Sequence, residues 1–184
     1  MAFSPGPNTT LSAALAANRG FQHAAQFALA VPVGWGVLLT LCALGLGGLI
    51  VAVPALAVAV KLIGVVYLLY LAYTLYGVGS LGQADGQRLS ITFWQGAALQ
   101  FVNIKAWMFA LSVVAGWIAG KSDPVQRFAI VLPMMMAFAC LSNLAYALVG
   151  SLLRGWLAQG ARLLWFNRVM ASMLVLTALW MGSV

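Results

Sequence analysis

Most of this sequence consists of apolar runs, each about long enough to cross a membrane as a helix. A helix needs about 20 apolar residues to span a hydrocarbon core that is about 30 Å thick. The runs between polar breaks predict about six helical segments, near residues 1–18, 24–50, 54–79, 93–119, 126–151 and 164–183. Only 6% of the 184 residues are charged, against about 25% in soluble proteins. We therefore predict an all-α polytopic membrane protein, a single transmembrane domain over residues 1–184.

The few charges indicate how the segments are oriented. The first loop carries Arg19 and the fifth carries Arg154 and Arg162, whereas the fourth pairs Lys121 with Asp123. Cytoplasmic loops are enriched in Lys and Arg, so the odd-numbered loops are predicted to lie inside and the C-terminus outside. The net charge of +7 then faces anionic lipid, and no basic cluster indicates a nucleic-acid partner.

Six segments divide into two halves, 1–80 and 93–184, which would insert with opposite topology as inverted three-helix repeats, a common transporter construction. Asn8 and Asn103 occupy matching places, each about 10 residues from the inner end of its segment, or about 15 Å deep at 1.5 Å per residue. That depth is the bilayer midplane, where polar groups usually face a cavity. The pattern predicts a substrate site between the first and fourth segments.

The run Ser4-Pro5-Gly6-Pro7-Asn8 cannot form an unbroken helix. Each proline lacks a backbone donor and clashes with the preceding turn, so carbonyls are freed that lipid cannot satisfy. Such carbonyls can bind a substrate ammonium, and the N-terminus of a half-helix can face a carboxylate. The alternative is a simple kink, in which Asn8 only satisfies the freed carbonyls.

Lys105 is the most informative charge in the apolar runs. An ammonium near the midplane costs at least about 2.5 kcal/mol unless it is paired or hydrated. It is a candidate partner for a substrate carboxylate and for a protonation change during exchange with protons, and the alternative is that it extends toward the membrane surface. Asn8 and Asn103 offer both donors and acceptors for an amino acid, or else cap the breaks.

The inventory of reactive side chains argues against an enzyme. The sequence has no HExxH motif, no acidic pair inside an apolar run and a single histidine, His23, so an intramembrane hydrolase would lack its acid, base or metal ligands. Cys42 and Cys140 have no CxxC spacing and are expected to be buried, inert thiols. No cofactor and no metal are predicted.

Several short motifs occur in order along nearly the whole chain: Pro5-Gly6-Pro7-Asn8, Gly20, the run KLIGVVYLLYL over residues 61–71, Asn103-Ile104-Lys105 and Asn167-Arg168. Together they resemble the LysE/RhtB family of amino-acid exporters. The resemblance implies a multi-pass protein of the bacterial inner membrane that exports amino acids or close analogues by secondary transport. The candidate substrate-binding residues are then Pro5, Gly6, Pro7, Asn8, Asn103 and Lys105.

The sequence departs from the family pattern in three places. Only four residues precede Pro5, where the family has about ten more apolar residues, so the first helix is expected to be truncated or broken. Asn103-Ile104-Lys105 replaces the usual Asn-Pro-Lys, which predicts a milder break, and the second segment lacks an embedded acid. A non-transporting scaffold subunit or an inactive, N-terminally truncated transporter is therefore the alternative. A GxxxG pattern at Gly116–Gly120 allows a homodimer.

Overall fold

The computed structural model describes residues 6–79 and 89–183, without the side chains of 49–51, and all regular elements in these ranges are helices. The all-α prediction is thus confirmed. In chain order the helices are α1 (Pro7–Arg19), α2 (Phe21–Ala43), α3 (Leu46–Ala52), α4 (Pro54–Tyr76), α6 (Phe93–Val102), α7 (Ile104–Val113), the π-helix η1 (Val114–Ile118), α8 (Pro124–Leu157) and α9 (Arg162–Ser183).

Four helices, α2, α4, α8 and α9, are long and apolar enough to cross a membrane, and α6 with α7 and η1 makes a fifth if the bent pair is one span. The chain is therefore a multi-pass membrane protein. Helix α1 has 13 residues and a length of only about 20 Å, which is short of the hydrocarbon thickness of about 30 Å. The predicted number of six spans is not confirmed.

The predicted end of the second segment is wrong. The segment expected over 24–50 stops at Ala43, because Gly45 turns the chain with φ 92° before α3 begins; such a positive φ is accessible to glycine and closes the helix. Gly116 and Gly120 do not share a helix face, since the helix ends at Ile118 and Gly120 has φ 69°. The two glycines of the GxxxG pattern therefore do not lie on one regular helix.

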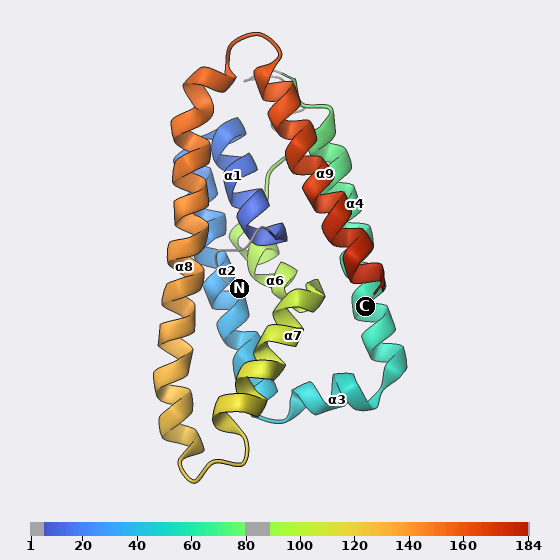
Figure 1. Ribbon diagram of the computed structural model, residues 1–184, viewed down its shortest axis with the longest axis vertical. Helices are drawn as coiled ribbons and strands as arrows, with labels where there is room; N and C mark the ends of the chain where they lie inside the picture. The colour runs from blue at the N-terminus through green and yellow to red at the C-terminus, as the bar shows by residue number, and fades with distance from the viewer. Residues whose placement is uncertain (1–5, 80–88, 184) are drawn as a thin grey trace.

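Helix α1 is central to the arrangement. It packs most extensively against α8, then against α2 and α9, while α4 pairs with α9, and α2 contacts both α8 and α6. Figure 1 shows α8 and the α4–α9 pair on opposite sides, with α1 between them and the N-terminal end of the α1 ribbon near mid-height. The short helix therefore begins inside the bundle.

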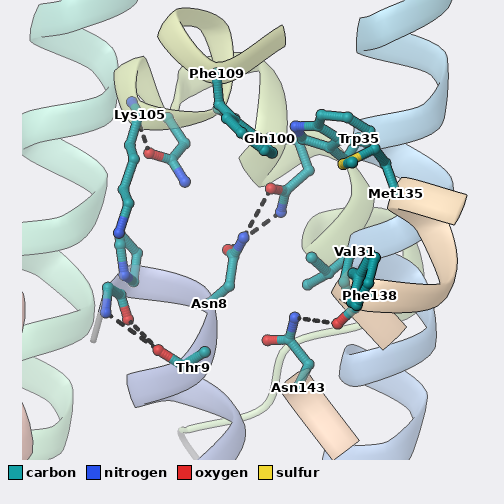
Figure 2. A pocket seen from close by; sticks show the side chains of 15 residues that line it. Asn8, Thr9, Val31, Trp35, Gln100, Lys105, Phe109, Met135, Phe138 and Asn143 are labelled. Carbon is teal, nitrogen blue, oxygen red and sulfur yellow. Dashed lines mark hydrogen bonds between the residues drawn. The ribbon is translucent and has the colours of Figure 1, made fainter. Parts of the chain in front are cut away.

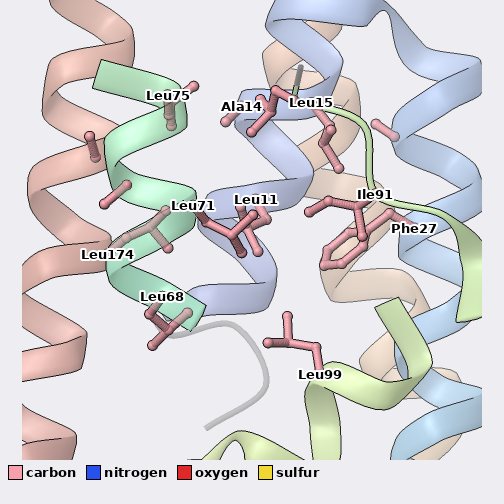
Figure 3. Close-up of a cluster of buried hydrophobic side chains, with 14 of the residues drawn as sticks. Leu11, Ala14, Leu15, Phe27, Leu68, Leu71, Leu75, Ile91, Leu99 and Leu174 are labelled. Atoms are coloured by element: carbon pink, nitrogen blue, oxygen red, sulfur yellow. The ribbon is translucent and has the colours of Figure 1, made fainter. Parts of the chain in front are cut away.

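The largest buried cluster surrounds α1. Leu11 and Leu15 meet Phe27 of α2, Leu71 of α4 and Leu174 of α9, all at most 4% exposed (Figure 3). Lipid tails are as apolar as leucine, so burial of these side chains away from lipid supplies little driving force, and close packing and interhelical hydrogen bonds stabilise the bundle.

Three glycines allow such close packing. A Cβ atom on Gly34 of α2 would overlap the backbone of Ala97 in α6, and one on Gly150 of α8 would overlap the backbone of Ala13 in α1. A Cβ atom on Gly64 of α4 would overlap the carbonyl oxygen of Val102 at the end of α6. These helices approach one another backbone to backbone, which small residues make possible.

Candidate functional site

The fifth candidate span is sharply broken at Asn103. Helices α6 and α7 meet there at 71°, and Asn103 has an extended backbone with φ −95° and ψ 100°. A continuous helix would pair the Lys105 N–H with the Phe101 carbonyl. Instead the Lys105 N–H donates to Asn103 Oδ1 at 3.2 Å, and Trp107 Nε1 donates to the Phe101 carbonyl at 2.8 Å. The expected mild break is a sharp one, because side chains replace the lost backbone bonds.

The start of α1 is the second interruption. Gly6 precedes the helix in an extended conformation, and Pro7 occupies the first helical position, where its missing N–H costs nothing. Thr9 Oγ1 accepts from the Gly6 N–H at 3.1 Å and donates to the Gly6 carbonyl at 3.2 Å. Helix α1 is thereby fixed at its first turn.

The two interruptions meet at one pocket, which is open to its surroundings. The pocket is lined from α1, α2, α6, α7 and α8 by Gly6, Pro7, Asn8, Thr9, Val31, Trp35, Gln100, Asn103, Lys105, Ala106, Phe109, Met135, Phe138, Ala139 and Asn143.

The polar face of the pocket, defined here as Asn8, Gln100, Asn103 and Lys105, comes from α1 and the broken span. Asn8 Nδ2 donates to Gln100 Oε1 at 2.8 Å, and Gln100 Nε2 donates back to Asn8 Oδ1 at 3.2 Å. Gln100 is fully buried and also donates to the Gly96 carbonyl at 3.1 Å. Figure 2 shows the Lys105 side chain extending from α7 toward the N-terminal end of α1.

The apolar face, defined as Val31, Trp35, Phe109, Met135 and Phe138, comes from α2, α7 and α8. The rings of Trp35 and Phe109 lie 5.7 Å apart at an interplanar angle of 36°. Trp35 is 6% exposed and belongs to a second buried cluster, against which Phe109 and Met135 pack. Figure 2 shows Lys105 on one side of the view and Val31, Trp35, Met135 and Phe138 on the other, with Asn8 between them.

Asn143 lies at the α8 side of the pocket and fastens α1 to α8. Its Oδ1 accepts from Ser12 Oγ at 3.0 Å, and its Nδ2 donates to the Ala139 carbonyl at 2.8 Å. The structure therefore places Asn143 both in an interhelical hydrogen bond and in the pocket lining.

The structure brings together five of the six residues predicted to bind substrate: Gly6, Pro7, Asn8, Asn103 and Lys105 all line this pocket. The sixth, Pro5, lies outside the described residues. Their roles in binding remain predictions. Sequence reasoning missed Gln100, although an amide in an apolar run three residues before Asn103 was a usable signal.

Trp35, Phe109 and Phe138 were also missed. They carried no such signal, because aromatic residues in apolar runs are ordinary. Only their position in the pocket lining distinguishes them from other buried or lipid-facing rings.

Comparison with known proteins agrees with this architecture. The family model described as LysE type translocator matches residues 1–183. The chain is similar to proteins named cysteine/O-acetylserine efflux protein from Escherichia coli (strain K12), Shigella flexneri and Shigella sonnei (strain Ss046). Each is 28% identical over 178 residues, which are 96% of this chain and 89% of the relative. No solved structure matches the chain significantly. The exporter prediction is confirmed at this level: the chain belongs to the LysE type translocator family.

Proposed function

We propose that this protein exports amino acids or close analogues from the cytoplasm across the bacterial inner membrane, and that the pocket at the two helix interruptions is its substrate site. The observation that carries the proposal is the meeting of the start of α1 with the α6–α7 break around a pocket that has amide groups and a lysine on one face. Discontinuous helices at such a site are typical of secondary transporters.

The carboxylate of an amino acid fits the polar face near the first residues of α1 and α7. Both helices begin at the pocket, with Pro7 and Ile104 as first residues, and the N-terminal end of a helix carries partial positive charge. Lys105, in the first turn of α7, adds a full positive charge. Gly6 and Pro7 form the start of α1 and line the pocket there, while the Asn103 side chain caps the start of α7. A contribution of Pro5 stays a prediction.

The ammonium group fits the C-terminal end of α6. The last carbonyls of a helix lack intrahelical partners and carry partial negative charge, and Gln100 and Asn103 of this end line the pocket. The side-chain oxygen of Asn8 is a further acceptor beside Gln100. Both charges of a zwitterion thus find complementary groups without an embedded carboxylate.

We further propose that transport proceeds by alternating access between two inverted halves, each with three spanning segments. In such a repeat α1 corresponds to α6, α2 to α8 and α4 to α9. The α1–α8 contact then corresponds to the α2–α6 contact, while the α2–α8 and α4–α9 pairs correspond to themselves. All four pairs are extensive contacts, as an inverted repeat requires. One chain carries every group assigned to the site, so the proposed transport does not require a second copy. The homodimer stays a prediction.

Replacement of Lys105 by alanine tests the site. We expect Lys105→Ala to abolish export of amino acids from dipeptide-loaded cells while membrane insertion is unchanged, because the variant loses the carboxylate partner. Lys61→Ala is the matched control, since Lys61 lies in α4 and is not part of the pocket lining. Undiminished export by Lys105→Ala would remove the lysine from the site. No export by the wild-type chain, at confirmed membrane expression, would favour the scaffold or inactive alternative.

A further inference from the structure

The apolar face of the pocket does not hold the two charged groups of an amino acid, yet its side chains also have defined packing partners. Val31 and Trp35 are one helical turn apart on α2, and Phe109 of α7 packs on Trp35 with ring centroids 5.7 Å apart. Met135 and Phe138 of α8 complete this face. A substrate bound through its ammonium and carboxylate at the polar face has its side chain free to reach this apolar face.

The chemistry of the apolar face excludes charged side chains. All five residues that form it are uncharged, and none of the residues that line the pocket is a carboxylate. A lysine or arginine side chain placed there would lose its hydration without gaining an ionic partner, which is costly in an apolar environment. The second carboxylate of an acidic substrate would lose its hydration in the same way.

The same face favours large apolar side chains over small ones. A methyl or hydroxymethyl side chain would leave the ring of Phe138, which is 45% exposed, uncovered, whereas a branched, thioether or aromatic side chain would contact it. Each additional buried CH₂ contributes about 0.8 kcal/mol, and sulfur makes favourable contacts with aromatic ring edges. Trp35 is held by the buried cluster behind it, so the face keeps its shape when a substrate is absent.

We propose that Val31, Trp35, Phe109, Met135 and Phe138 determine substrate specificity, and that the exporter prefers amino acids with large uncharged apolar side chains, of the size of leucine, methionine or phenylalanine. This inference rests on the proposed function of the same pocket. It assigns the side-chain specificity to α2, α7 and α8, separately from the backbone recognition assigned to the polar face.

The test uses the full chain reconstituted in liposomes loaded with an equimolar mixture of alanine, serine, leucine, methionine, phenylalanine, lysine and aspartate. Loss of each amino acid is measured and divided by the amount of inserted protein. We expect the wild-type chain to release methionine, leucine and phenylalanine at least about 10-fold faster than alanine, because a few methylenes in an apolar pocket are worth about that much discrimination. Lysine and aspartate are expected to remain.

Two variants separate specificity from packing. Phe138→Ala is expected to lower the preference for phenylalanine over alanine about 10-fold, whereas Phe128→Ala, on the same helix but outside the pocket lining, should keep the wild-type preference. Met135→Glu places a carboxylate on the apolar face and is expected to bring lysine among the exported substrates while methionine export falls.

The outcomes are distinguishable. Equal release of alanine, methionine and lysine by the wild-type chain, or equal loss of preference in Phe138→Ala and Phe128→Ala, would overturn the specificity proposal and leave amino-acid export standing. Release of no amino acid by inserted wild-type chain would overturn the proposed function itself, and with it the inference.

Discussion

Asn103 shows how a single residue can break a span without proline. It ends α6 with an extended backbone, and its side chain accepts from the Lys105 N–H at the start of α7. A proline at position 104 would break the helix by removing a backbone N–H donor. Here the Asn103 side chain instead accepts from the Lys105 N–H, which the break has freed, and Trp107 Nε1 donates to the freed Phe101 carbonyl. Capping by asparagine is worth about 1 kcal/mol at a typical helix.

Asp123 is expected to make the folding stability of the protein depend on pH. It lies before α8, where a hydrogen bond from Arg127 Nε at 2.6 Å holds the pKa of this carboxyl below its usual value. A lowered folded-state pKa means that the stabilisation is present above the unfolded-state pKa and is lost as the pH falls through the folded-state value. Because the side chains of Asp123 and Arg127 are both partly exposed, the effect is small.

We therefore expect Asp123→Asn to lower the unfolding temperature slightly at pH 7 and to make no difference at pH values below the lowered pKa of Asp123. Thermal unfolding in detergent across this pH range measures the effect. Arg127→Gln, which removes the partner, is the control and should behave alike. A difference between wild type and Asp123→Asn that widens as the pH falls would contradict the assignment.

Helix α1 is the element whose attachment matters most, because its first residue lies at the pocket. Among the residues that the structure describes, interhelical hydrogen bonds join Asn8 to Gln100 of α6, Ser12 to Asn143 of α8, and Asn18 to Asn167 of α9. Asn18 and Asn167 exchange two bonds of 2.7 and 2.9 Å, and Asn167 also donates to the Val78 carbonyl. Polar contacts therefore position a helix too short to span the membrane alone.

Gly64 determines how closely α4 approaches the broken span, because a side chain there would overlap the Val102 carbonyl. We expect Gly64→Ala to destabilise the protein by about 1–3 kcal/mol, the usual cost of overpacking, and to lower export through displacement of the α6–α7 break. Unfolding of the detergent-solubilised protein and export from cells provide the two measurements.

Gly155→Ala is the matched control, since a Cβ atom at Gly155 of α8 would meet nothing within 4 Å. This change is expected to be neutral or slightly stabilising, as alanine is the better helix former by up to about 1 kcal/mol. A Gly64→Ala variant as stable and active as Gly155→Ala would show that the close approach of α4 is unimportant.

At the scale of the whole molecule, the outer faces of α4, α8 and α9 are apolar. Tyr73, Leu152 and Leu176 are 83%, 74% and 65% exposed, as expected for side chains that face lipid. Helix α8 has 34 residues and is about 51 Å long, more than the bilayer core needs. The loops at its two ends therefore lie on opposite sides of the membrane.

The excess of Lys and Arg in odd-numbered loops predicts which side each loop faces. In a background where Cys42 and Cys140 are replaced by serine, Lys121→Cys should react with a membrane-impermeant maleimide in intact cells, because the loop before α8 is predicted outside. Gln159→Cys, after α8, should react only in permeabilised cells. The reverse labelling pattern would contradict the predicted orientation.

The sequence by itself determined the membrane class and most helical segments, because hydropathy is a property of a local stretch of chain. The depth of Asn8, Asn103 and Lys105 in the bilayer stays a prediction from the rise per residue. The sequence did not predict the turn at Gly45, because the chain stays apolar on both sides of this residue and hydropathy does not reveal a change in backbone φ. Nor did it predict that the break would be sharp without a proline, since the compensating bond from Trp107 crosses the break.

Only the tertiary structure decided the rest of the site. Gln100 pairs with Asn8 across 92 positions, Gly64 lies against the end of α6, and Trp35 packs on Phe109 from another helix. Each of these contacts joins residues far apart in the chain, and its partner is set by how helices cross, which the pattern of any one helix does not contain. The local sequence pattern thus determined which segments could span a membrane and where they carry polar residues. Interhelical packing decided which side chains share the pocket.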